Sequence, residues 1–168
     1  GCTLVTCAAL VEVGWLALAQ AVPGQVQALW GRWCGPMKTA YNARTSRWTV
    51  SLSNQCKPGA GATHGHDGWG HIGPISSSGG ARAADPELYE LVYPFTQRQY
   101  AYWPASGGAG RWRGGLGVRA VWRIDADSAL CVTTGGGLRP ETVALGLAGG
   151  RPGPIAQQTE QTLRNIAA

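Results

Sequence analysis

Charged residues are scarce in this sequence of 168 residues. Asp, Glu, Lys and Arg together make up only 14% of it, well below the roughly 25% that is usual in soluble proteins. A chain with so few charges has little to keep a large surface soluble, so we expect it to bury much of that surface against a partner. The alternative is a small monomer whose surface consists of Gly, Ser, Thr and Gln.

Lysine is almost absent, although the chain is basic overall. The formal net charge is +5, and Lys38 and Lys57 are the only lysines beside twelve arginines. The arginines are spread from Arg32 to Arg164, and the longest basic cluster is the short run "RWR". A nucleic-acid-binding surface would group Lys and Arg on one face or along one helix. The pattern therefore disfavours a nucleic-acid partner, whereas arginine is well suited to interfaces and buried ion pairs.

Acidic residues are few, and closely spaced pairs of cysteines are absent from the sequence. The few carboxylates are scattered, which argues against a paired-carboxylate hydrolase on this chain alone. The cysteines show no C-x-x-C spacing, so a zinc ribbon and a thioredoxin-like motif are unsupported. We expect reduced, buried thiols in a cytoplasmic protein. The five cysteines are Cys2, Cys7, Cys34, Cys56 and Cys131.

No hydrophobic run is long enough to cross a membrane without interruption. The first 22 residues are apolar, but Glu12 and Gly14 interrupt them, and a membrane span needs about 20 apolar residues. No basic residue precedes Arg32, which disfavours a signal peptide. A core helix is the better interpretation. Because the sequence starts with Gly rather than Met, we expect Gly1 to be an internal point of a longer reading frame or a terminus made by processing.

The remaining patterns predict an α+β fold in a single domain. Apolar residues at helical spacing predict a helix over residues 3–22, ended by Pro23-Gly24, and a second short helix over residues 25–30. Alternation predicts strands near residues 48–52, 95–102, 118–124 and 129–136, with an extended segment after an Asp85-Pro86 turn and a tight turn at "LAGGRPG". We therefore expect a helical part (1–30), a strand (45–56), a Gly-rich loop (57–85), a β-rich region (86–150) and a tail with weak helical tendency (151–168).

The stretch "SGGAGRWRGGLGV", residues 106–118, is rich in glycine. It lacks the Lys and the Ser or Thr that a P-loop needs, and it supplies no G-x-G-x-x-G at a strand-to-helix junction. A strand pattern follows it, so no helix N-terminus is available for an anion. We interpret it as a tight connection in which backbones approach closely. Arg111 and Arg113 would flank Trp112 and hold a neighbouring segment or subunit.

A second glycine-rich stretch, "THGHDGWGH", contains residue types that bind metals. His64, His66 and Asp67 are candidate ligands, and His71 follows shortly after. Histidine with a carboxylate suits zinc, manganese or iron. The alternative is that these side chains are exposed or bonded to the backbone of a turn. A serine nucleophile is disfavoured, because "GPISSSGG" does not match G-x-S-x-G.

Several motifs occur together in "GPISSSGGARAADPELYELVYPFTQRQYAYWPASGGAGRWRGGLGV". A glycine-rich stretch is followed by an E-x-x-Y-P segment ("ELVYPF"), a tyrosine-containing strand ("RQYAYW") and "SGGAGRWRGGLGV". Downstream lies "GLRPETVALGLAGGRPG". In order and spacing, these elements resemble the C-terminal part of the hydantoinase B/oxoprolinase family. The resemblance covers most of residues 15–153.

This resemblance implies a subunit of an ATP-dependent assembly that opens cyclic amides or carboxylates ketones. The implied partners are a hydantoinase A-type ATP-binding subunit and the N-terminal part of a B-type subunit. ATP and a divalent metal would be bound mainly by those other chains, so the isolated chain would be inactive. Catalytic residues are not assigned. The residues expected at a substrate site or an interface are Arg82, Tyr93, Arg111 and Arg113.

The sequence departs from the family pattern in three places. The N-terminal half of B-type subunits, with its acidic and histidine metal-ligand motifs, is absent. Pro104-Ala105 stands where an acidic residue usually precedes "SGGAG", and the segment from Trp30 to Cys56 matches nothing in the family. Three interpretations stay open: a catalytic part of the complex, a non-catalytic scaffold chain of it, or a small independent metal-binding domain.

Overall fold

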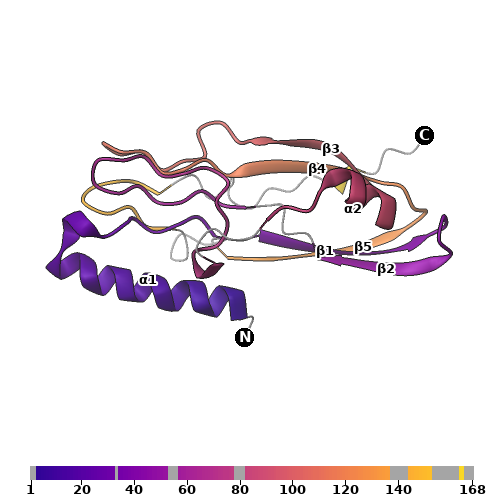
Figure 1. The fold of residues 1–168 in the computed structure, drawn as a ribbon, viewed down its shortest axis with the longest axis horizontal. Helices are drawn as coiled ribbons and strands as arrows, with labels where there is room; N and C mark the ends of the chain where they lie inside the picture. The colour runs from indigo at the N-terminus through magenta and orange to yellow at the C-terminus, as the bar shows by residue number, and fades with distance from the viewer. Residues whose placement is uncertain are drawn as a thin grey trace.

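The computed structural model describes residues 3–32, 34–52, 57–77, 82–136, 144–152 and 163–164. Its main elements are two α-helices and two three-stranded sheets, so the predicted α+β class is confirmed. The molecule is elongated: the sheets are stacked at one end, and α1 runs below extended segments at the other (Figure 1). The elements are α1 (Thr3–Ala21), η1 (Pro23–Gln25), β1 (Cys34–Asn42), β2 (Arg47–Leu52), η2 (Ile75–Ser77), α2 (Pro86–Val92), β3 (Phe95–Tyr102), β4 (Val118–Ile124), β5 (Ala129–Gly135) and β6 (Leu163–Arg164).

The first sheet has the order β2-β1-β5 and is antiparallel throughout. β1 is its central strand, and Met37 on β1 lies opposite Leu52 on β2 and Val132 on β5. The predicted strands that became β2 and β5 are confirmed. β1 was not predicted, because Gly35 and Pro36 at its start are typical of a turn rather than a strand.

The second sheet has the order β3-β4-β6. β3 and β4 are antiparallel and confirm the two predicted strands, with an irregularity between Gln97 and Gln99. β6 pairs with β4 in parallel, so Leu163–Arg164 is strand where the tail was expected to be weakly helical. The rest of the predicted tail beyond residue 152 lies outside the described residues.

The two sheets and α2 share a small core. Ala40 of β1, Tyr89 of α2 and Phe95 of β3 form one buried cluster, against which Tyr93 and Ile124 pack. Trp122 of β4 is completely buried beside Ala120, with Tyr100 packed on them. α2 therefore bridges the two sheets at this end of the molecule.

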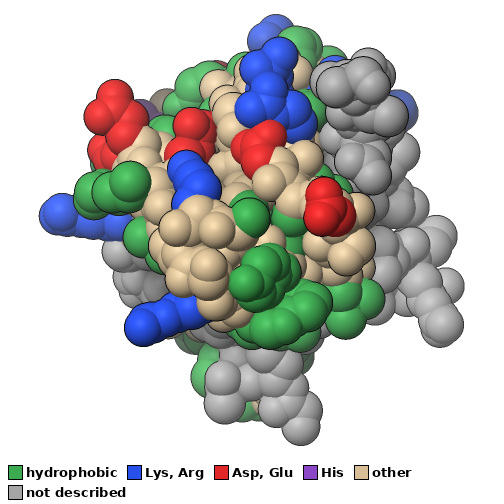
Figure 2. All heavy atoms as spheres, turned by 90° about the vertical axis from the view of Figure 1, so that its right-hand side faces the viewer, with side chains coloured by type: hydrophobic (Ala, Val, Ile, Leu, Met, Phe, Trp, Pro, Cys, Tyr) green, Lys and Arg blue, Asp and Glu red, His purple; other side chains and the backbone are tan. Residues whose placement is uncertain are grey.

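Helix α2 replaces the extended segment that was predicted after Asp85. The Asp85 carboxylate accepts hydrogen bonds from the backbone N–H groups of Glu87 and Leu88, and Pro86 occupies the first turn. Asp followed by Pro is a helix-start signal as well as a turn signal, and here the helix forms. Figure 2 views this end of the molecule, where acidic and basic side chains are interspersed with hydrophobic ones.

The turn between β1 and β2 holds α2 in place. Arg44 donates to the backbone carbonyls of Glu90 and Tyr93, at 2.5 and 3.0 Å. The Asn42 side chain donates to the carbonyl of Val92 and accepts the N–H of Arg44. These bonds pair carbonyls at the end of α2 that have no partner within the helix.

Apart from the short helix η2, the described residues of the glycine-rich segments 57–77 and 106–117 lie outside the helices and sheets. They run side by side in extended conformation, joined by single backbone hydrogen bonds such as Gly115 N–H to Ala60 O and Ala60 N–H to Trp69 O, both 2.8 Å. A Cβ at Gly115 would lie 2.1 Å from the carbonyl oxygen of Trp69, and one at Gly59 would lie 2.0 Å from that of Gly115. Only glycine permits such close backbone contact. The predicted tight connection at residues 106–118 therefore has a physical basis.

The predicted helix over residues 25–30 is wrong. After η1 the chain is extended, because the N–H groups of Ala28, Leu29 and Gly31 donate to carbonyls of other segments instead of within a helix. Those carbonyls belong to Ala62, Leu145 and Gly59. The tight turn predicted at "LAGGRPG" is present: Gly149 has a φ of 85°, and the Gly150 N–H donates to Leu147 O.

Helix α1 confirms the first predicted element but is not a fully buried core helix. One side packs through Trp15 and Ala8 on a cluster formed by Trp30, Ala60 and Ile75, while its other side leaves Leu10, Val13 and Leu18 exposed. In the described part of the chain, no helix combines the length and apolarity required to span a membrane. Cys7 on α1 is a free thiol but exposed, against the expectation of buried cysteines.

Candidate functional site: a basic cavity among glycine-rich segments

A cavity of about 390 Å³ lies among the extended segments. Glycine and alanine make up half of the residues that line it, and the lining comes mainly from residues 26–32, 57–64, 106–118 and 144–152. Four basic side chains line it, and the described lining residues include no Asp or Glu. The cavity therefore has a positive lining. The four basic residues are Arg32, Lys57, Arg111 and Arg151.

Lys57 is the most deeply buried of these cations, with 6% of its surface exposed. Burial lowers the pKa of its ammonium group, because a charge in a poorly solvated site is less stable. Burial also lowers the pKa of His71, and the positive charge of Lys57 lowers it further. The Nε2 atom of His71 is hydrogen-bonded to the Tyr100 hydroxyl. This hydrogen bond attaches His71 to β3.

Arg32 connects the cavity to helix α1. Its guanidinium donates to the carboxylate of Glu12, which is 3% exposed. Burial raises the pKa of the Glu12 carboxyl, and the charge of Arg32 and the hydrogen bond from it oppose that rise. One acidic side chain of the helix therefore offsets one of the four cavity cations.

One part of the cavity lining, called the rim here, combines a tilted pair of rings with a cation. The His64 and Trp112 rings lie 4.6 Å apart between centroids, inclined by 59°. The guanidinium of Arg111 lies 4.9 Å from the centre of the Trp112 ring, within the range of a cation–π contact. A negatively charged or planar molecule suits this rim and the positive interior behind it.

The glycine-rich segments that form the cavity contain motifs on which the sequence resemblance rests, including "SGGAGRWRGGLGV". The sequence model of the hydantoinase B/oxoprolinase family matches residues 1–167. This chain belongs to that family. A curated relative, the caprolactamase subunit beta of Pseudomonas jessenii, is 35% identical over 120 residues. The match covers 70% of this hydantoinase B-family chain but 21% of the relative, so the chain spans about a fifth of its length.

Two solved structures are similar to this hydantoinase B-family chain. The ATP-dependent caprolactamase of Pseudomonas jessenii matches with a TM-score of 0.55 and 34% identity, covering 62% of this chain and 18% of that one. The nucleotide-free acetone carboxylase matches with a TM-score of 0.65 and 23% identity, covering 82% of this chain and 18% of the other. The latter likeness is one of fold.

The structure does not bring the three predicted metal ligands of the family chain together. His64 makes a tilted ring contact with Trp112, Asp67 accepts the backbone N–H of Arg113 at 2.7 Å, and His66 is exposed. Within the described ranges, no group of three or more His, Cys, Asp or Glu side chains is placed to hold a metal ion. The described residues therefore lend no support to the predicted metal site.

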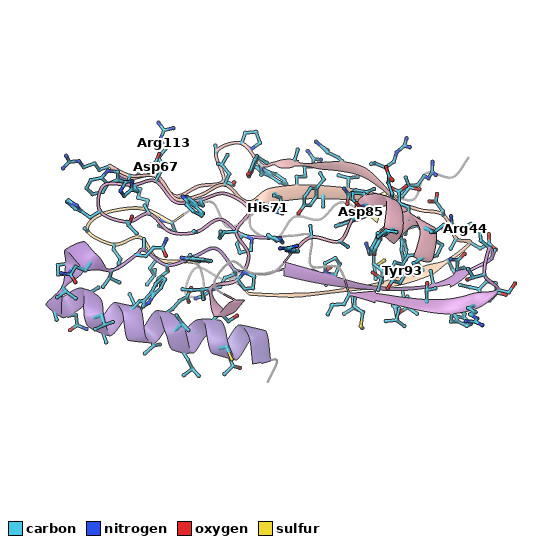
Figure 3. The ribbon with its side chains drawn as sticks, viewed as in Figure 1. Arg44, Asp67, His71, Asp85, Tyr93 and Arg113 are labelled. Carbon is cyan, nitrogen blue, oxygen red and sulfur yellow. The ribbon has the colours of Figure 1, made fainter. Side chains whose placement is uncertain are left out.

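The predicted interface residues fall at two separate places. Arg111 lines the cavity. Arg113 lies beside Asp67, and its side chain points away from the body of the molecule (Figure 3). Tyr93 is at the opposite end beside Arg44, half-buried with its ring 4.7 Å from that of Tyr89. Arg82 is exposed. A shared interface role for the four stays a prediction, and Tyr93 has a clear role in the core.

Sequence reasoning missed the most unusual buried group, Lys38 of β1. Its side chain is completely buried, and its ammonium nitrogen lies 3.9 Å from the Trp122 ring centre, 4.9 Å from Tyr89 and 5.0 Å from Phe95. Burial raises the pKa of the neighbouring Cys131 thiol, and the Lys38 charge opposes the rise. The available signal was that Lys38 is one of only two lysines in the chain, but only the tertiary structure supplies the rings around it.

Proposed function

We propose that this chain is the C-terminal part of a B-type subunit in an ATP-dependent enzyme that opens cyclic amides or carboxylates ketones. The observation that carries the proposal is the 35% identity with the caprolactamase subunit beta over 70% of the chain. Acetone carboxylase shares the fold, and for that reason ketone carboxylation is kept beside amide opening in the proposal. The substrate itself is left open between a lactam and a ketone.

ATP and a divalent metal belong mainly to other parts of the proposed complex. These are a hydantoinase A-type ATP-binding subunit and the N-terminal part of a B-type subunit, in a cytoplasmic hetero-oligomer. This chain is similar to a caprolactamase and to an acetone carboxylase, and the reactions of both are described as ATP-dependent. The glycine-rich stretch around Arg111 contributes a basic cavity, not a nucleotide loop.

The basic cavity favours a direct part in the reaction. Hydrolysis of a cyclic amide and carboxylation of a ketone both yield a carboxylate, and phosphorylated intermediates are negatively charged as well. Lys57, Arg111 and Arg151 line a space of about 390 Å³ that suits such groups. Their role would be to attract and orient an anion rather than to perform a bond-breaking step.

A scaffold role is the second candidate, and the glycine packing favours it. The carbonyl oxygens of Trp69 and Gly115 lie where side chains would otherwise be, so these segments act as a rigid backbone support. In this case the chain would complete the B-type fold and dock the ATP-binding subunit without contacting substrate.

The first experiment is native mass spectrometry of the untagged chain isolated from its source. A stoichiometric complex with larger chains supports the proposal, and a stable lone monomer rejects it. ATP-dependent turnover of a lactam and of a ketone is then measured in the complex with Arg111→Ala and Arg151→Ala, each of which removes one cavity cation. Arg98→Ala is the matched control, because Arg98 is exposed on β3 away from the cavity.

The outcome separates the two candidates. A loss of turnover in either variant with assembly preserved, and none in Arg98→Ala, supports a catalytic contribution. If all three complexes assemble and turn over normally, this chain is a scaffold.

A further inference from the structure

The sheet β2-β1-β5 buries several polar side chains on one face and exposes apolar side chains on the other. The side chains that face the second sheet and α2 include Lys38, Asn42 and Ser51, which are 0%, 0% and 1% exposed. The opposite face is apolar and open, with exposed fractions from 39% to 68%. We call it the outer apolar face. It consists of Met37, Tyr41, Trp48, Val50, Leu52, Leu130 and Val132.

Strand register makes this face continuous rather than scattered. Met37 lies opposite Leu52 on one side and Val132 on the other. Tyr41 lies opposite Trp48, with ring centroids 5.9 Å apart. Thr39, between them on β1, lies opposite Val50 and Leu130. The apolar side chains therefore form rows that cross the strands.

Such a face is the reverse of what a solvent-exposed sheet carries. An antiparallel sheet with one wet face normally places polar residues there and apolar residues toward the core. Here the polar residues are inside, where they have partners: Ser51 hydrogen-bonds the Tyr89 hydroxyl, and Asn42 donates to Val92 O. Extended apolar patches of this kind mark interaction surfaces.

We propose that the outer apolar face packs against the part of a B-type polypeptide that the relatives have and this stretch lacks. The occupant is an apolar surface of that region, on the same polypeptide or on a separate one. This inference rests on the B-type assignment in the proposed function. Its support is length: the chain corresponds to 21% of the caprolactamase subunit beta and to 18% of each similar structure. About four-fifths of each relative lies outside the matched region and is available to cover this face.

Two tryptophans give a matched probe of this surface. Trp48 on the outer apolar face is 68% exposed, and Trp69 among the glycine-rich segments is 74% exposed. Hydroxyl-radical footprinting compares the 168-residue chain alone with the assembled B-type complex. We expect Trp48 to be oxidised readily in the chain alone. In the complex, the B-type N-terminal region should cover Trp48 and protect it from oxidation. Met37, the single methionine, reports the same face through peroxide oxidation.

Two leucines provide the matched variants. Leu130 on the outer apolar face is 64% exposed, and Leu88 on α2 is 65% exposed. Leu130→Glu should weaken association with the B-type region by about tenfold or more, because it buries a carboxylate in an apolar contact. Leu88→Glu should leave association unchanged. The unfolding temperature of the isolated chain should stay close to that of the parent in both variants.

Other results overturn the proposal. Trp48 that stays equally reactive in the complex, or a Leu130→Glu variant that assembles normally, means that the face is not the contact. Protection that grows with the concentration of the isolated chain identifies a second copy as the occupant, and cross-links to the ATP-binding subunit identify that chain instead. A complex with Trp48 protected by the B-type region but without ATP-dependent turnover rejects the proposed function alone.

Discussion

At the scale of single residues, glycine determines how closely the extended segments approach. The backbone of Gly115 lies against the carbonyl of Trp69, and that of Gly61 against the carbonyl of Ala28, so a Cβ would come within 2.1 and 1.9 Å of those oxygens. Backbone cannot move aside as the end of a flexible side chain can. Each of these glycines is therefore required by packing rather than by an unusual φ angle.

Substitution of Gly115 tests this requirement. Gly115→Ala should lower the free energy of unfolding by about 1–3 kcal/mol, as overpacking does in well-packed interiors. Gly14→Ala is the control: nothing lies within 4 Å of a Cβ there, and it should raise helix stability by about 1 kcal/mol. Both are measured by chemical denaturation. Equal effects of the two changes would contradict the close-packing argument.

His71 makes stability depend on pH. Burial and the charge of Lys57 lower its pKa below the usual 6.5, so the folded state binds the proton less well than the unfolded state. Its contribution to stability is therefore present above the unfolded pKa and lost as the pH falls through the folded value.

We expect the free energy of unfolding to fall between about pH 7.5 and about pH 5, with a shallower dependence in His71→Gln. Urea unfolding at several pH values measures it. His66→Gln is the matched control, because His66 is exposed and should retain the dependence of the parent. If the free energy of unfolding of His71→Gln depends on pH as steeply as that of the parent, His71 is not the source of the pH dependence.

At the scale of elements, local pattern and long-range partners compete. Residues 25–30 have an apolar content that suits a helix, yet their N–H groups donate to other segments and the chain stays extended. Residues 86–92 followed their local start signal and became α2. A seven-residue helix is marginal alone, so the cap at Asp85 and the bonds from Arg44 stabilise it.

The cap can be tested directly. Asp85→Ala should lower the free energy of unfolding by about 1 kcal/mol, because the N–H groups of Glu87 and Leu88 lose their acceptor. Asp85→Asn keeps an acceptor and should stay within about 0.5 kcal/mol of the parent. Guanidinium denaturation of the three proteins decides it. If Asp85→Asn loses as much free energy of unfolding as Asp85→Ala, the charge of Asp85 matters rather than its hydrogen bonds to the helix N-terminus.

At the scale of the whole molecule, two contacts among the described residues attach helix α1 to the extended segments. They are the Glu12–Arg32 ion pair and the apolar cluster around Trp30. Glu12 is buried, so its charge is tolerated only beside the guanidinium. The ion pair therefore joins α1 to the basic cavity that Arg32 lines.

Removal of the Glu12 carboxylate should loosen this attachment. Glu12→Ala leaves the Arg32 guanidinium without its carboxylate and should cost about 2 kcal/mol. Hydrogen exchange of the α1 amides should speed up more than that of β4. Gln20→Ala, at an exposed position of the same helix, should change stability by less than about 0.5 kcal/mol. Unaltered exchange in Glu12→Ala would mean that the apolar cluster alone holds the helix.

The sequence by itself determined the family, the α+β class, helix α1 and the strands β2 to β5, because these depend on motif order and on short-range periodicity. The tertiary structure decided which face of each strand is buried. In the sheet β2-β1-β5, Lys38 is inside because three aromatic rings from other elements surround it, and Trp48 is outside. It also decided that His64 and Asp67 contact Trp112 and Arg113 rather than each other. His64 and Asp67 are close in sequence, but the residues that they contact lie in a segment about fifty residues further along the chain.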